Sequence, residues 1–180
     1  MAAPRQMTAN TLNAVKGWPQ PAAVDFETQL DAAVPDADLP LLAGSVVRVN
    51  ASGKFEVGIG TDDVMPMFTF QNSDDPDVQN DGGDASTEKG VFVPISPTGA
   101  MMALVAVGAY ELVSTSFKLD DTFAPNAFLT SDKSGGANPG LLKIGTKYTD
   151  MICGVVSRGK VDNGYRHEAV AFWPFPIFPS

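Results

Sequence analysis

The chain has 180 residues and a mass of 18.9 kDa, the size of one folded domain that can carry an extended arm. Hydrophobic residues make up 44% of it, enough to bury a core, so wholesale disorder is excluded. Its 12 basic and 21 acidic residues give a net charge of −9. This charge disfavours nucleic-acid binding, because that binding depends on cations that displace counterions from phosphates.

Glycine and proline indicate the fold class. The chain has 17 Gly and 14 Pro, and inside a helix each Gly costs about 1 kcal/mol and each Pro about 3 kcal/mol. From residue 109 onward, short runs of β-branched and aromatic residues are each closed by Gly, Pro or Asn. This spacing is typical of a mainly β protein. We expect a small β-barrel or β-sandwich body with an extended N-terminal arm.

Residues 1–40, the N-terminal segment, differ from the rest because prolines recur at positions 19, 21, 35 and 40. Proline holds the backbone extended and removes an N–H donor, so we expect neither a cooperative helix nor a central strand here. An arm laid against another surface would bury the scattered apolar side chains Leu12, Val15, Trp18, Val24, Phe26 and Leu30. A frayed tail, or a short helix over residues 25–30, is an equally good alternative.

The body is expected to span residues 41–180 and to begin with a hairpin over residues 44–58. Apolar residues alternate with polar or small ones on both sides of a turn that runs from Asn50 to Gly53. Asn and Gly accept the positive φ angles that such turns need. A further strand is predicted over residues 65–70, with Pro66 near its start or at a sheet edge.

Residues 71–90 form a polar, acidic stretch that predicts a surface loop. The spacing of Asp75, Asp77 and Asp81 is compatible with Ca²⁺, since hard cations take oxygen ligands from such loops. However, Asn80 stands where an EF-hand requires Gly, and no Glu closes the loop. A solvated acidic loop is the better interpretation, and no metal ligand is assigned.

The long apolar run over residues 100–110 follows a predicted strand at 91–95 and can be a buried strand or a buried helix. Gly108 and the β-rich flanks favour the strand. The run is too short to cross the ~30 Å of bilayer hydrocarbon, so no membrane partner is expected. No apolar segment follows Arg5, so no export signal is expected either.

Further strands are predicted over residues 109–113, 127–130 and 141–144, with a loop at 131–140. Residues 151–173 have the pattern of paired strands, joined by a tight turn at Asn163-Gly164. The C-terminal tail, residues 174–180, is apolar but interrupted by prolines. If this tail were exposed to solvent, it would be an apolar patch prone to association, so we expect it to pack on the body or on a neighbour.

Candidate catalytic residues are few. A Ser-His-Asp or Cys-His catalyst needs a histidine base, and the one histidine, His167, lies on the polar side of a predicted hairpin without a nucleophile motif. The single Cys153 is best interpreted as a small buried apolar residue. Gly58-Ile59-Gly60 lacks the third glycine of a dinucleotide site. We assign no catalytic or cofactor-binding residue and expect no enzyme activity and no cofactor. A carboxylate hydrolase or lyase is the weakest alternative.

Five phrases within the body together resemble a known group of proteins. They are LLAGSVVRVNASGKFEVG, MMALVAVGAYELVSTSF, APNAFLTS, GTKYTDMICGVVSRG and AFWP. Residues 41–173, which contain these phrases almost entirely, resemble the head decoration (capsid cement) proteins of tailed bacteriophages. The resemblance implies a β body, symmetric oligomers on the outer capsid surface of the virion, and an N-terminal segment that contacts the shell. The protein would be made in the host cytoplasm.

The resemblance implies that the partners are the major capsid protein and further copies of the chain, as a trimer or a dimer. Because aromatic and aliphatic anchors dominate binding energy, we expect Leu12, Val15, Trp18 and Phe26 to bind the capsid. For self-association the candidates are the apolar residues at the C-terminal end, Trp173, Phe175, Ile177 and Phe178. The alternative function is a tail or fibre-associated adhesin that presents loops 71–90 and 131–140 to a host receptor.

Overall fold

The computed structural model describes residues 12–16, 26–29, 41, 43–69, 101–106, 110–162 and 168–180, with the backbone alone at 12–16, 26–29, 101–106 and 162. The described residues contain no helix, so the predicted mainly β fold is confirmed. The strands are β1 (Leu12–Lys16), β2 (Phe26–Gln29), β3 (Val46–Val49), β4 (Phe55–Val57), β5 (Pro66–Thr69), β6 (Met101–Ala106), β7 (Glu111–Ser114), β8 (Phe128–Thr130), β9 (Lys143–Ile144), β10 (Gly154–Asp162) and β11 (Glu168–Trp173).

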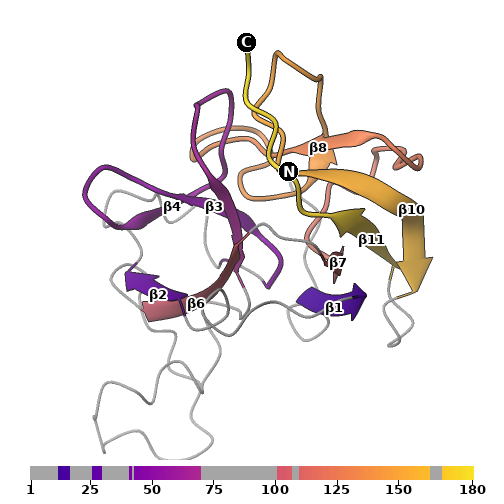
Figure 1. The fold of residues 1–180 in the computed structure, drawn as a ribbon, viewed down its shortest axis with the longest axis horizontal. Coiled ribbons are helices and arrows are strands. Elements are labelled where there is room, and N and C mark those ends of the chain that lie inside the picture. Colours follow the sequence, from indigo (N-terminus) through magenta and orange to yellow (C-terminus); the bar gives the residue numbers. More distant parts are fainter. Residues whose placement is uncertain are drawn as a thin grey trace, which may run out of the picture.

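The strands form two antiparallel sheets that lie beside each other (Figure 1). The first has six strands in the order β1-β7-β11-β10-β8-β9, and the second has five in the order β2-β6-β5-β3-β4. All the strand-to-strand pairings within the two sheets are antiparallel. The second sheet is built largely from the first half of the described chain and the first sheet largely from the second half. Each sheet also takes one strand from the N-terminal segment.

The predicted hairpin over residues 44–58 is confirmed as β3 and β4, with Val47 opposite Val57 and Val49 opposite Phe55. The side chain of Asn50 closes its turn by accepting hydrogen bonds from the N–H groups of Ser52 and Lys54, at 2.9 and 3.1 Å. Local sequence determines this turn, because an Asn side chain can replace a backbone acceptor two residues on.

Two further strand predictions are confirmed in the second sheet. β5 begins at Pro66, the position where a missing N–H is tolerated. Residues 101–106 form β6, which lies between β2 and β5, so the apolar run is a strand in this part and not a helix. The predicted loop at 71–90 and the strand at 91–95 lie outside the described residues.

The main core lies between the two sheets. The ring of Phe68 in β5 packs against the ring of Phe172 in β11, with centroids 5.2 Å apart. Both side chains are fully buried, together with Leu112, Leu129 and other residues of the same cluster. Burying a side chain of this size contributes about 1.5–3 kcal/mol, so contact between the sheets is the main source of stability.

The first sheet also closes partly on itself. After β7 the chain bends, and Phe117 forms a parallel bridge with Leu142, next to β9 at the far edge of the sheet. The N–H of Lys118 donates to the carbonyl of Leu142 at 2.8 Å, and the N–H of Leu142 donates to that of Ser116 at 3.0 Å. These bonds join the segment after β7 to the residue that precedes β9, so the two-sheet body has a partial closure of the kind found in barrels.

The described parts of the N-terminal segment are edge strands of the two sheets. Among the described strands, β1 pairs with β7 alone and β2 with β6 alone. The sequence predicted that this segment forms no central strand, which agrees with these positions. It lies along its own body in these two places, and its contact with another surface stays a prediction.

The β10–β11 hairpin confirms the pairing predicted for residues 151–173, with Val161 opposite Ala169 and Asp162 opposite Glu168. A bulge between Val156 and Gly159 bends β10, and Gly159 has a φ of 86°, which glycine adopts without strain. The predicted turn at Asn163-Gly164 lies outside the described residues.

Candidate interaction surface

The C-terminal tail is held against the body by backbone hydrogen bonds. Ile177 and Ile152 exchange both N–H···O bonds, at 2.9 and 3.1 Å, and the N–H of Phe175 donates to the carbonyl of Cys153 at 3.2 Å. At its end, the N–H of Ser180 donates to the carbonyl of Tyr148 at 3.1 Å. The prediction that the tail packs on the body is therefore confirmed. In effect the tail adds a short strand beside the segment that leads into β10.

The prolines of the tail alternate with the residues that donate these bonds. Phe175 and Ile177 donate their N–H groups to the body, and the intervening Pro174 and Pro176 have no N–H to donate. Each proline removes a backbone donor that a further strand could otherwise use. The prolines therefore make the tail a poor edge for an added strand, and side-chain contact is the more favourable way for a partner to meet it.

Large apolar side chains are exposed along this part of the chain. The exposed fractions are 39% for Trp173, 58% for Phe175 and 44% for Phe178, while Ile177 is half-buried. Scattered apolar residues on a surface are ordinary, but several rings along one short segment are typical of an interaction site. All four residues predicted for self-association are therefore at least partly accessible.

Tyr148 extends this surface. It is 54% exposed, and its carbonyl receives the hydrogen bond from the end of the tail. Its φ is 68°, in the left-handed region that residues other than glycine rarely adopt. The Lys147 ammonium lies 4.5 Å from the centre of its ring and 5.7 Å from that of Phe128. The exposed aromatic residues of the tail and of the segment bonded to its end, Tyr148, Trp173, Phe175 and Phe178, are together named the aromatic surface below.

The residues predicted to bind the capsid are placed only in part. Leu12 and Val15 belong to β1 and Phe26 to β2, where the backbone alone is described. Trp18 lies outside the described residues. Leu12 and Val15 are on one edge strand and Phe26 is on an edge strand of the other sheet, so the backbone does not place all these anchors on one strand.

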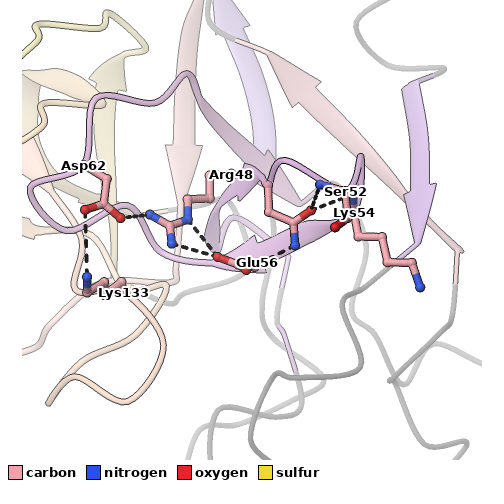
Figure 2. A network of polar contacts seen from close by, with 7 residues as sticks. Arg48, Ser52, Lys54, Glu56, Asp62 and Lys133 are labelled. Carbon is pink, nitrogen blue, oxygen red and sulfur yellow. Dashed lines mark hydrogen bonds and ion pairs between the residues drawn. The ribbon is translucent and has the colours of Figure 1, made fainter.

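A second feature of the surface is a network of charged side chains on the β3–β4 hairpin (Figure 2). Two guanidinium nitrogens of Arg48 donate to Glu56 Oε2, at 2.7 and 3.0 Å, and a third contact reaches Asp62. Lys133 Nζ lies 3.8 Å from the other oxygen of Asp62. The hydrogen bond from Arg48 lowers the pKa of Asp62.

This network joins elements rather than leaving charges available for a ligand. Asn50 Nδ2 donates to Glu56 at 3.1 Å, so the network runs from the hairpin turn through Arg48 and Asp62 to Lys133 in the 131–140 loop. Each charged member drawn in Figure 2 between Glu56 and Lys133 has an oppositely charged partner. We interpret the network as a structural contact that holds the β3–β4 hairpin and the 131–140 loop together.

Glu111 is a buried charged residue that the sequence reasoning missed. Its side chain is fully buried, and its Oε1 accepts hydrogen bonds from Ser157 Oγ at 2.5 Å and from Arg158 Nε at 2.9 Å. Both donors come from the bulge of β10, so the bulge turns them toward β7. The available signal was a lone Glu within the apolar run over residues 109–113, which the sequence predicted as a strand, since a carboxylate is rarely buried unless it is paired.

Of the candidate reactive residues, Cys153 lies in the described part of the chain. Cys153 is fully buried, and burial raises the pKa of its thiol far above the ordinary value. Its interpretation as a buried apolar residue is confirmed. His167 and the acidic residues at 75–84 lie outside the described residues. Among the residues described, no group of three or more His, Cys, Asp or Glu side chains could hold a metal ion.

Comparisons with known proteins return no relative. No protein family model, no curated protein and no solved structure matches the chain. Where residues are described, no helix is long and apolar enough to pass through a membrane.

Proposed function

We propose that the protein is a virion structural protein that binds the outer surface of a phage capsid and cements neighbouring major capsid subunits. The observation that carries the proposal is the aromatic surface. It combines exposed rings on a segment held by backbone hydrogen bonds with prolines that disfavour strand addition. This combination suits a protein that binds by surface contact in a defined stoichiometry.

The N-terminal segment would make the contact with the shell. A stable protein contact buries on the order of 1,200 Å² or more. A proline-rich segment with spaced apolar anchors can cover such an area with a modest loss of entropy. Leu12, Val15, Trp18 and Phe26 are the proposed anchors, and the major capsid protein is the proposed partner.

The aromatic surface would join copies of the chain around a capsid symmetry axis, as a trimer or a dimer. In a dimer this surface would meet its own copy across a two-fold axis, whereas in a trimer it would meet a different surface of the next copy, and either arrangement is closed. Trp173, Phe175, Ile177 and Phe178 are the proposed contact residues. The exposed rings of Trp173, Phe175 and Phe178 are the best candidates for strong binding contributions, because aromatic residues are enriched in protein interfaces.

The adhesin alternative depends partly on the 131–140 loop, and contacts with the second sheet restrain this loop. The N–H of Gly60 donates to Ser131 and the N–H of Ser134 donates to Val57, at 2.8 and 3.0 Å. Asp132 within the loop pairs with Lys143. These bonds favour a structural role for this loop over receptor binding.

Copy number is the experiment that tests the proposed function. Quantitative mass spectrometry of purified particles should find the protein in a simple whole-number ratio to the major capsid protein. A tail or fibre protein would be present in far fewer copies, and its detection at that level would replace the proposal by the adhesin. Absence from the particles would overturn both functions.

Substitution of Trp18 tests the shell contact. Trp18→Ala should weaken attachment to undecorated shells by about 2 kcal/mol, roughly thirtyfold in Kd, if Trp18 is a hot spot. Leu119→Ala is the control, since Leu119 is 57% exposed on the body and outside the proposed contact. Equal binding by both variants would remove Trp18 from the interface. Sedimentation of shells with the labelled protein measures the difference.

A further inference from the structure

The N-terminal segment supplies the outermost strand of both sheets. β1 is the terminal strand of the six-stranded sheet, and β2 is the terminal strand of the five-stranded sheet. An outermost strand has one neighbour, so it can leave its sheet without breaking the pairings behind it. What it leaves is an open edge on β7 or β6 that accepts a strand of matching sequence.

The connection from β2 to the body is longer than the pairing within one chain requires. β2 ends and β3 begins at the same end of the second sheet, because the pairs β2–β6, β6–β5 and β5–β3 are all antiparallel. Three strand spacings separate β2 from β3, about 14 Å across the sheet. Leu41, which is only 1% exposed, marks where the chain has joined the core.

The eleven residues 30–40 join β2 to that point. Fully extended, eleven residues reach about 36 Å, which is close to the diameter of a folded body of about 140 residues. Pro35 and Pro40 lie within this connection and favour extended backbone. The connection can therefore reach an adjacent copy of the protein.

We propose that copies of this chain exchange their N-terminal segments, so that β1 and β2 of one copy pair with β7 and β6 of a second copy. The pairing partners are the same in either arrangement, for example Asn13 opposite Val113 and Glu27 opposite Ala103. The exchange therefore costs little contact energy, and it becomes favourable where the local concentration of copies is high.

Exchange would join copies in a way that the aromatic surface does not. It uses main-chain pairing along both sheets, whereas the aromatic surface would act through its side chains. Each exchanged segment would also separate only when two strand pairings break together. Strand exchange would occur in the free protein, so its test does not depend on whether the protein binds a capsid.

The test uses two differently tagged full-length chains, one carrying Asn13→Cys and the other Val113→Cys. The two are unfolded together, refolded at high concentration and oxidised. A disulfide that joins the two tags requires β1 of one chain to lie beside β7 of the other. Val113 is 4% exposed and cysteine is of similar size, so the fold should tolerate the change. The natural Cys153 is fully buried, so it should not react.

A matched control uses Val161→Cys and Ala169→Cys, which are opposite each other in the β10–β11 hairpin. This pairing is local in the chain, so mixed chains should give no product that carries both tags. A second test pair, Glu27→Cys with Ala103→Cys, examines the β2–β6 pairing independently and decides the question if Val113→Cys fails to fold.

We expect a prominent disulfide-linked product with both tags for the two N-terminal pairs, and its share should rise with the concentration at refolding. Cross-tag product no greater than that of the hairpin control, at every concentration, would overturn the exchange. The same conclusion would follow if chains carrying both Asn13→Cys and Val113→Cys closed only internal disulfides.

Discussion

At the scale of single residues, Gly58 has little room for a side chain. Its φ is 71°, and a Cβ added to it would lie 1.7 Å from the backbone oxygen of Asp132. Gly53 has a similar φ of 74°, but a Cβ there would meet nothing within 4 Å. The two glycines therefore separate the effect of backbone conformation from the effect of close approach.

Gly58→Ala should lower the free energy of unfolding by clearly more than Gly53→Ala does. Both substitutions carry the cost of a left-handed residue, about 1–2 kcal/mol. Only Gly58→Ala must also push the 131–140 loop away from the second sheet. Urea denaturation of the three proteins measures the difference. Equal losses would mean that the two segments can move apart freely.

Asp132 makes stability depend on pH. Burial raises the pKa of Asp132, but the hydrogen bonds from Lys143 and from the N–H of Asn138 outweigh it, so the pKa lies below the ordinary value of 3.8. A carboxylate with a lowered pKa stabilises the fold above its unfolded pKa and loses this effect as the pH falls below it.

Asp132→Asn should therefore reduce the dependence of stability on pH between about pH 5 and pH 2, while lowering stability at neutral pH through loss of the Lys143 ion pair. Asp63→Asn is a suitable control, because Asp63 is exposed. Thermal unfolding across this pH range measures the slopes. An unchanged acid slope in Asp132→Asn would contradict the assigned role.

At the scale of elements, the tail depends on the N–H groups of Phe175 and Ile177. Ile177→Pro removes the donor that bonds to Ile152 at 3.1 Å, whereas Ile177→Ala keeps it and removes only side-chain atoms. We expect Ile177→Pro to be less stable than Ile177→Ala by about 1 kcal/mol, the net contribution of one hydrogen bond. Urea denaturation measures this difference, and faster carboxypeptidase digestion should accompany it. Equal behaviour of the two variants would argue that side-chain packing alone holds the tail.

Elements with local signals are those that the sequence predicted well. The β3–β4 hairpin has its Asn50 turn, β5 has a leading proline, and β10 and β11 are close in the chain. Pairings between distant segments have no such signal. β1 pairs with β7, about a hundred residues later in the chain, and no residue pattern in either strand identifies its partner. The order of strands in both sheets therefore could not be derived from the sequence.

In the candidate surface, too, local features could be predicted from the sequence and contacts between distant segments could not. Exposed rings in a proline-interrupted tail are predictable, because apolar side chains and missing donors are both visible in the sequence. The contribution of Tyr148 is not predictable, since it depends on a hydrogen bond between its carbonyl and Ser180. The pairing of Glu111 with Arg158 is not predictable from the sequence either. It depends on the order of the strands, in which β11 lies between β7 and β10.

At the scale of the whole molecule, the distribution of charge and apolar surface limits how copies can meet. A net charge of −9 makes copies repel one another in general, so association needs a local apolar contact that outweighs this repulsion. The aromatic surface is such a contact, and Lys147 beside Tyr148 places a positive charge there.

Phe175→Ser combined with Phe178→Ser should therefore weaken self-association strongly while leaving the fold intact, since both rings are exposed. Loss of even one hot-spot ring costs about 2 kcal/mol or more, at least roughly thirtyfold in the dissociation constant. Leu119→Ser is the matched control, because Leu119 is equally exposed, at 57%, but lies in a different part of the chain. Sedimentation equilibrium over a range of concentrations measures both variants. If the double variant associates as the unmodified protein does, the tail is not the contact between copies, and the exchanged N-terminal strands would have to hold any oligomer alone.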